Sequence, residues 1–301
     1  MAFSQSLQDS SFRDLVVFNS FSIKVVALAV MTIDHVAVYL FEFPAVAASY
    51  VALRSIGRIA APLFLFVVTE SARHTSSRPR FILRLYSANL LCEGIGFVSN
   101  NVLSGSIGTY HFGNIFPTLM YTVVVIHFTE KMVRSFRGRK YRGLFAWLAG
   151  LLAVCLVPAL ASSFLLNSQM IPAALPALTA VQASSVLDMA AALLPSILTV
   201  EYSLLFVLLG LFWYWSPSKA LKVVLLVAFS LLARFPMGLE DIGLFFTFFG
   251  AQQYYMVLAA PLIALYNGKR GPSLKYLFYA YYIIHPYILI VIGSVIGANP
   301  G

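Results

Sequence analysis

The sequence predicts an all-α, polytopic transmembrane helical bundle of about nine to ten spans, with its N-terminus in the cytoplasm. Two observations predict this class. Of the 301 residues, 60% are hydrophobic and only 10% are charged, with a mean hydropathy of +0.86, whereas about 25% of the residues of a soluble domain are charged. The apolar residues also fall into runs of about 20, the length that crosses a hydrocarbon core of about 30 Å.

Charge and cysteine content argue against other classes. The net charge of +9 arises from Lys and Arg in short loops between apolar runs, which is how a helical bundle sets its orientation. This pattern does not favour nucleic-acid binding. Cys92 and Cys155 both lie inside apolar runs, so neither a disulfide framework nor a thiolate metal site is expected, and no metal is expected.

The apolar runs define the expected elements in chain order. Residues 1–20 are mixed in character and predict an N-terminal interfacial segment with an apolar side that includes Phe12, Leu15, Val16 and Phe18. Residues 21–301 predict a single integral membrane domain, because no polar linker separates the runs. The first run follows a long leader and contains a polar pair, so it is not expected to be a cleaved signal peptide. The expected spans are residues 23–41, 53–71, 81–98, 114–133, 144–164, 201–215, 220–233, 252–266 and 276–296.

Two apolar stretches do not fit a simple span. Residues 165–198 contain Pro172, Pro176 and Pro195, which predicts either a spanning helix or a re-entrant half helix that protein must bury. Residues 242–249 are too short to span comfortably and predict a second short piece.

The basic residues predict the orientation. They occur in alternate loops, whereas the loops at residues 100–113 and 165–187 contain no Lys or Arg. Positive charge marks the cytoplasmic side, so we expect a bacterial inner-membrane protein with Gly301 outside. The basic loops contain Arg73, Arg78 and Arg80; Lys131, Arg134, Arg137, Arg139, Lys140 and Arg142; Lys219 and Lys222; and Lys269, Arg270 and Lys275.

Ionisable residues inside these spans are the candidate site. Asp34 and His35 are adjacent in the first span, with His35 about 18 Å along the helix from residue 23. An intramembrane charge costs on the order of 3 kcal/mol or more and indicates function by default. Arg54 and Arg58, four residues apart, start the second span at the same outer level. The same level includes Asn89 and Glu93 in the third span and Glu201 at the start of the sixth, and His285 lies at mid-depth in the last span.

This cluster suits proton transfer. A His beside a carboxylate can act as a general base, and an arginine can hold an oxyanion, a carboxylate or a phosphate. Adjacent helical residues point about 100° apart, so Asp34 can instead pair with Arg58 and leave His35 facing a cavity. Structural readings remain open: Arg54 can snorkel, Glu93 and Glu201 can pair with arginines, and a lone core histidine needs no function.

Three blocks of the chain resemble the TraX family. The first contains Ile33-Asp34-His35 and the stretch LRSIGRIAAPLF at residues 53–64. The second is NIFPTL at residues 114–119, and the third is YNGKRG at residues 266–271 followed by KYLFY at residues 275–279. His285 lies where the family usually has a His after a Tyr-Pro pair, although here Pro286 follows the His. The combination of these blocks is specific, whereas each alone is weak.

The resemblance implies a protein linked to N-terminal acetylation of pilin in conjugative systems, and it implies a more distant similarity to integral membrane acyltransferases. The expected reaction transfers acetyl from cytoplasmic acetyl-CoA, the acyl donor, to the amine of a pilin or another envelope acceptor. The expected catalytic residues are His35 as base, Asp34, Arg58 and Arg54, with His285 as a second candidate base or acyl carrier. The expected phosphate-binding residues are Arg73, Arg78, Arg84, Lys269 and Arg270, and the expected acceptor-binding residues are Glu93, Asn89, Asn114 and Glu201.

Two other functions remain open on the sequence. A transporter or permease for a small anionic substrate can use the same buried charges. A non-catalytic pilus assembly factor can hold pilin subunits in the membrane without His35, because family analogy does not determine function.

Overall fold

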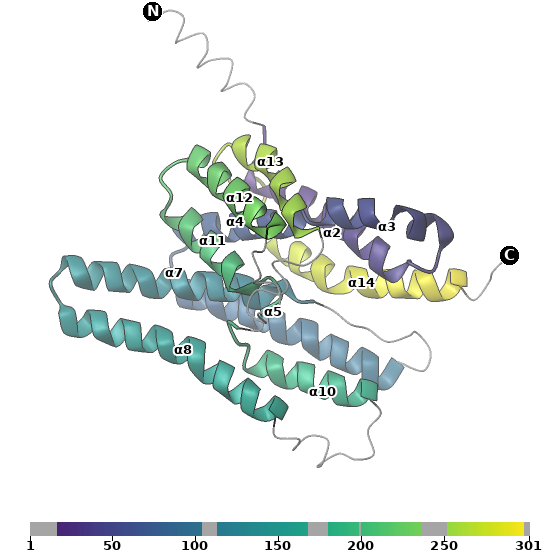
Figure 1. Ribbon diagram of the computed structural model, residues 1–301, viewed down its shortest axis with the longest axis horizontal. Helices are drawn as coiled ribbons and strands as arrows, with labels where there is room; N and C mark the ends of the chain where they lie inside the picture. Colours follow the sequence, from purple (N-terminus) through teal and green to yellow (C-terminus); the bar gives the residue numbers. More distant parts are fainter. Residues whose placement is uncertain (1–16, 104–112, 168–179, 199, 236–251, 298–301) are drawn as a thin grey trace, which may run out of the picture.

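The computed structural model describes residues 17–103, 113–167, 180–198, 200–235 and 252–297 (Figure 1). Within these residues the chain forms helices and connections, without a β-strand, which confirms the all-α class. The helices are α2 (Ser20–Tyr39), α3 (Pro44–Gly57), α4 (Ala60–His74), α5 (Arg78–Val98), the π-helix η1 (Ser99–Leu103), α7 (Ile115–Arg137), α8 (Tyr141–Asn167), α10 (Ala180–Leu193), α11 (Ser203–Trp215), α12 (Lys219–Arg234), the 3-10 helix η2 (Gln253–Ala259), α13 (Ala260–Ala264) and α14 (Lys275–Gly297).

Several of these helices are long and apolar enough to cross a membrane. In the described part of the chain, five qualify: Ser20–Tyr39, Pro44–His74, Arg78–Asn101, Tyr141–Ala161 and Tyr276–Ile296. Ser203–Trp215 and Gln253–Ala264 are apolar but shorter. The chain therefore has the build of a multi-span membrane protein, while the count of nine to ten spans and the orientation stay predictions.

The second expected span differs from the structure. Residues 53–71 do not form one uninterrupted helix, because α3 starts at Pro44 and the α-helix breaks after Gly57 before α4 begins. Proline favours the first turn of a helix, where its missing N–H is not needed. Arg54 and Arg58 consequently lie at a break within the helical segment Pro44–His74, not at the outer start of a span.

The regions without a simple span are only partly described. The stretch 165–198 contains the end of α8 and the helix α10, while Pro172 and Pro176 lie outside the described residues, as do residues 1–16 and 242–249.

The start of α2 is held by the YNGKRG block. Phe18, which we expected on the apolar side of an interfacial segment, forms a parallel backbone bridge with Tyr266. Asn19 caps α2 and lies against Gly271, where an added Cβ would meet the Asn19 amide. Gly268 and Gly271 have φ of 77° and 67°, a left-handed conformation that glycine adopts without strain. The left-handed backbone favours glycine at both positions, and the close approach of Asn19 favours it further at Gly271.

α7 is the central helix of the bundle. Its N-terminal half, from Ile115 to Ile126, is almost entirely buried, and it packs against α4, α5, α8 and α11. α11 approaches α7 and α4 closely at Gly210, where an added Cβ would meet Thr122 and Leu65. Nearby, the Trp213 indole is fully buried and donates to the carbonyl oxygen of Lys222 over 2.8 Å.

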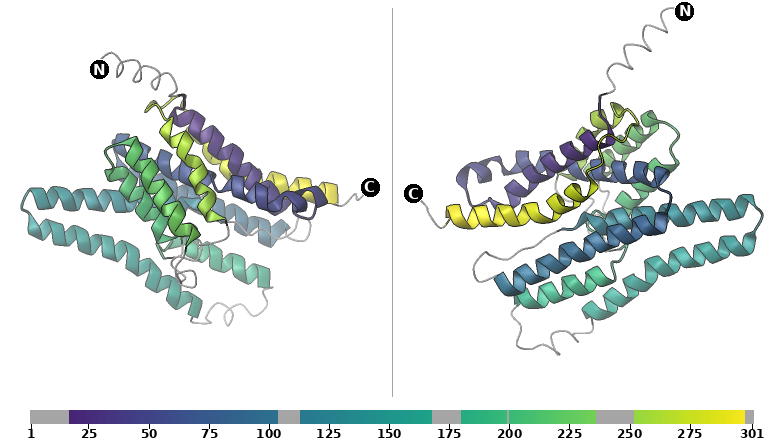
Figure 2. Two further views of the ribbon diagram at one scale, coloured as in Figure 1. Left: turned by 45° about the horizontal axis from the view of Figure 1, so that its top comes forward. Right: turned by 180° about the vertical axis from the view of Figure 1, so that it is seen from behind.

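α8 lies at the edge of the molecule, along α7 (Figure 1). Only 6% of its most apolar stretch, within Tyr141–Ala161, is buried in the protein. Phe145, Leu160 and Phe164 are each about two-thirds exposed. Both views in Figure 2 show α7 and α8 as a hairpin that extends away from the other helices. An apolar surface of this extent suits contact with lipid.

The basic turns lie on one side of the bundle and are tied together. Lys222 of α12 pairs with Glu70 of α4, and Arg78 pairs with Glu130 of α7 over 2.6 Å. Arg73 donates to backbone carbonyls at the end of α11, those of Trp213, Tyr214 and Ser216. The α2–α3 turn and the end of α14 lie on the opposite side (Figure 1). The basic turns thus gather on one face, as their alternation predicted.

Replacing Gly210 by Ala should destabilise the bundle. The new methyl group would overlap Thr122 and Leu65, and overpacking of this kind costs about 1–3 kcal/mol. The matched control is Gly94→Ala in α5, where a Cβ would meet nothing within 4 Å. Thermal unfolding of the detergent-solubilised variants checks this. Equal melting temperatures for the two variants would show that close packing at Gly210 is unimportant.

Candidate functional site

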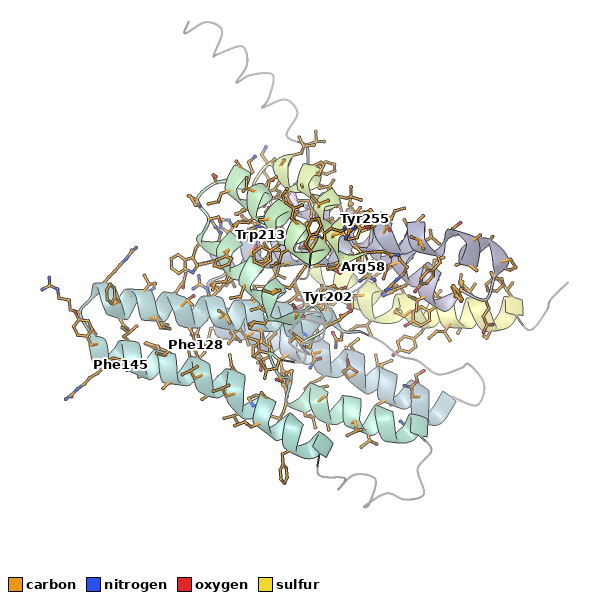
Figure 3. The ribbon with its side chains drawn as sticks, viewed as in Figure 1. Arg58, Phe128, Phe145, Tyr202, Trp213 and Tyr255 are labelled. Carbon is orange, nitrogen blue, oxygen red and sulfur yellow. The ribbon has the colours of Figure 1, made fainter. Side chains whose placement is uncertain are left out.

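A polar cavity lies where α2, the α3–α4 break, the start of α7, the start of α11 and α14 meet. Its volume is about 210 Å³. Figure 3 labels Arg58 and Tyr202, which reach it from the α3–α4 break and from the residue before α11. We call it the histidine cavity; its polar lining includes Asp34, His35, Arg54, Arg58, Glu201, Tyr39, Tyr202 and Tyr282.

Two histidines form a stacked pair at this cavity. The rings of His35 and His285 lie 4.8 Å apart at 18°, and His35 Nδ1 lies 2.5 Å from His285 Nε2. His285 Nδ1 lies 2.9 Å from the backbone oxygen of Tyr281. Because a carbonyl oxygen only accepts, His285 donates from Nδ1 and its neutral Nε2 accepts from His35 Nδ1. The basic atom of His35 is therefore Nε2.

Asp34 is held by an arginine from the next helix. Arg54 Nη1 lies 2.5 Å from Asp34 Oδ2. The sequence left open a pairing of Asp34 with Arg58, but in the structure Asp34 pairs with Arg54. Gly57 permits it, because an added Cβ at Gly57 would overlap the Asp34 side chain. Gly57, which lies between Arg54 and Arg58 in the sequence, thus makes room for the carboxylate.

Arg58 and Glu201 line the same cavity, but each has a buried polar atom without a hydrogen bond to a described residue. Arg58 Nη1 lies 3.4 Å from Gln253 Oε1, and Arg58 Nε is buried without a hydrogen bond to any described residue. The Glu201 carboxylate interacts favourably with the Arg58 charge, and its Oε2 is likewise buried without a described partner. Glu201 packs on Gly113, where a Cβ would overlap it. Buried polar atoms without a partner are rare in folded proteins, so these two atoms mark the cavity as a candidate binding site.

The four predicted acceptor residues, Asn89, Glu93, Asn114 and Glu201, line a second cavity of about 250 Å³. This cavity adjoins the histidine cavity, because Gly113 and Glu201 line both. Asn114 Nδ2 donates to Asn89 Oδ1 over 2.8 Å and to Glu93 Oε1 over 3.0 Å. Asn89 in turn donates to the carbonyl of Ala192 in α10. Asn114 also caps α7. The two asparagines join helices, while Glu93 and Glu201 supply carboxyl groups to the cavity.

The predicted phosphate-binding residues divide into two groups. Arg84 and Arg270 line a third cavity of about 370 Å³ on the face of the basic turns, together with Lys24 and His74. We call it the basic cavity. Arg84 Nε is buried there without a hydrogen bond to a described residue. Arg73 and Arg78 instead hold backbone and carboxylate partners within the bundle, and Lys269 does not line the cavity.

Sequence reasoning missed Lys24, Tyr202, Tyr282 and Gln253. Lys24 had a usable signal, because it is a charged residue at the start of the first apolar run. The other three reach the site only through folding. Among the described residues, no group of three His, Cys, Asp or Glu side chains is placed to hold a metal ion.

Comparison with known protein families finds a match over part of the chain. Residues 20–162, just under half of the chain, match the family model described as TraX protein. The match includes Asp34, His35, Arg54, Arg58 and Arg84. No curated protein and no solved structure matches the chain. The match agrees with the first two motif blocks, and residues 20–162 are similar to the TraX family.

Proposed function

We propose that this protein is a membrane acyltransferase of the inner membrane that transfers acetyl from cytoplasmic acetyl-CoA to the N-terminal amine of a pilin or another envelope acceptor. The match of residues 20–162 to the TraX family model supports a conjugation-related, pilin-associated role, and the acyl transfer is our proposal. The observation that carries it is the His35–His285 pair at a cavity that also contains two arginines and two carboxylates.

His35 is the general base of this proposal. The hydrogen-bond chain from the Tyr281 carbonyl through His285 orients His35 so that Nε2 carries the lone pair. His35 lines the cavity and His285 does not. This geometry supports His35 as the catalytic residue and His285 as a positioning residue behind it, in a Tyr281–His285–His35 chain that resembles the base-and-orienter logic of a catalytic triad.

The reaction is balanced without a further reagent. The acceptor nitrogen attacks the carbonyl carbon of the thioester as His35 Nε2 removes a proton from it. The C–N bond forms, the C–S bond breaks, and the proton passes from His35 to the departing CoA thiolate. The products are an N-acetylated acceptor and free CoA thiol, and His35 returns to its neutral form.

Arg58 is best placed to stabilise the oxyanion of this step. Arg54 is engaged with Asp34, whereas Arg58 keeps a buried Nε without a partner in the described chain. A preorganised donor of this kind is typically worth a factor of about 100 to 1,000 in rate. Asp34 balances the arginine charge beside His35.

The histidine cavity and its adjoining cavity suit the acceptor, and the basic cavity suits the acyl donor. Glu93 and Glu201 supply carboxyl oxygens to the cavity that Asn89 and Asn114 also line, and these oxygens can accept hydrogen bonds from a neutral acceptor amine. Lys24, Arg84 and Arg270 give the basic cavity a positive lining, which favours the phosphates of acetyl-CoA. Acceptor and donor would then enter from opposite faces of the bundle.

Replacing His35 by Ala should reduce acceptor acetylation by about 100-fold or more, because a general base contributes at least that factor. The matched control is His127→Ala, which removes a histidine of α7 that packs against Trp147 of α8 and lines none of the three cavities. Intact-mass analysis of candidate envelope proteins from cells with each variant checks this. Undiminished acetylation with His35→Ala would contradict the assignment and favour an assembly role, whereas vesicle uptake without a covalent product would favour transport.

Replacing His285 should act through His35. We expect His285→Ala to lower kcat by about tenfold to hundredfold with little change in the KM for acetyl-CoA, because loss of an orienting partner has an effect of this size. His285→Gln keeps an oxygen that can accept from His35 Nδ1 and should retain more activity. A steady-state assay of CoA release checks both variants. A rise in KM alone, or equal losses in both variants, would show that His285 does not orient the base.

Replacing Gly57 by Ala should reduce activity by about 100-fold, since misplacement by about 1 Å costs that factor. The new Cβ would overlap Asp34 and displace it from Arg54 beside His35. Gly94→Ala is the matched control, because its Cβ would meet nothing within 4 Å. The same CoA-release assay and a melting temperature separate lost activity from lost stability. Normal turnover by Gly57→Ala would show that the Asp34–Arg54 pair is dispensable.

A further inference from the structure

Three aromatic residues lie between the basic cavity and the histidine cavity. Tyr279 lines the basic cavity and Tyr282 lines the histidine cavity. Phe116 contacts both: its ring centroid lies 5.8 Å from that of Tyr279 in a stacked arrangement and 4.7 Å from that of Tyr282. We call Phe116, Tyr279 and Tyr282 the aromatic layer.

The aromatic layer is held in place by its neighbours. The backbone N–H of Ile115 donates to Tyr282 Oη over 3.2 Å, and the N–H of Phe116 donates to Asn114 Oδ1 over 3.0 Å. Phe64, which also lines the histidine cavity, packs edge-on against Tyr282 at 6.2 Å. Phe116 and Tyr282 are only 5% and 6% exposed. The rings therefore form a tight and largely preformed partition.

The layer lies between the proposed phosphate site and the proposed base. Tyr279, Tyr282 and His285 occur at intervals of three residues on α14, so they follow one another along one side of the helix. The distance along the axis from Tyr279 to His285 is about 9 Å. A thioester with phosphates held by Lys24, Arg84 and Arg270 must pass the layer to meet His35.

We propose that the aromatic layer is a gate that restricts the transferred acyl group to short chains, with Phe116 as the residue that determines the limit. This inference rests on the proposed acyl transfer. Phe116 is the limiting ring because it contacts both tyrosines, so its removal opens the partition without loss of the Tyr282 hydrogen bond. Filled apolar space discriminates by about 10–200-fold per methylene group.

The test compares acyl donors of different length. Full-length protein in lipid nanodiscs is given acetyl-, butyryl- or octanoyl-CoA and a synthetic apolar peptide with a free amino terminus, and intact mass measures the acylated peptide. Wild type should use acetyl-CoA and discriminate strongly against octanoyl-CoA. Phe116→Ala should raise the octanoyl-to-acetyl ratio of kcat/KM by about tenfold or more. Phe116→Leu should give a smaller rise and serves if the alanine variant does not fold.

The matched control is Phe128→Ala. Phe128 is on the same helix as Phe116 but packs against Trp147 between α7 and α8 (Figure 3). The Phe128→Ala variant should leave the octanoyl-to-acetyl ratio of kcat/KM unchanged. Wild-type use of octanoyl-CoA equal to acetyl-CoA, or an unchanged ratio in both Phe116 variants, would overturn the gate while acyl transfer stands. No acylated peptide and no CoA release with any donor would instead overturn the proposed function, and the gate with it.

Discussion

The ion pair between Asp34 and Arg54 is the constraint on which the site depends. Both side chains lie inside helical segments of membrane-spanning length, with 16% and 21% of their side-chain surface exposed. A charge left alone in such surroundings costs about 3–5 kcal/mol once its partner is removed. The pair therefore joins α2 to α3 at one level, and Gly57 allows the approach. His35 follows Asp34 directly, so the same contact places the histidine.

The second constraint is the return of α14 to this level. His285 comes from 250 residues further along the chain, and both views in Figure 2 show α14 beside α2 and α3. The α14 helix connects two parts of the site because it carries Tyr279 at the basic cavity and His285 at the histidine pair. One helix thus spans the distance from the proposed donor site to the proposed base, with an aromatic layer between them.

The positive charges of the basic turns have separate physical roles. Arg73, Arg78 and Lys222 form hydrogen bonds or ion pairs within the bundle. These contacts join α4, α5, α7, α11 and α12. Arg84 and Arg270 remain at a cavity with Lys24. Sequence position could not separate these groups, because all are cations near helix ends in loops of the same sign. Only the locations of Glu70 and Glu130 decide which of them are neutralised.

The sequence by itself determined the all-helical membrane class, the grouping of basic turns and most of the cluster, because apolar run length and the high cost of intramembrane charge are local properties. The tertiary structure decided the partners. It assigned Asp34 to Arg54, placed His285 behind His35, and broke the expected second span at Gly57. Those outcomes depend on contacts between distant segments, and neither periodicity nor spacing records which helices pack together.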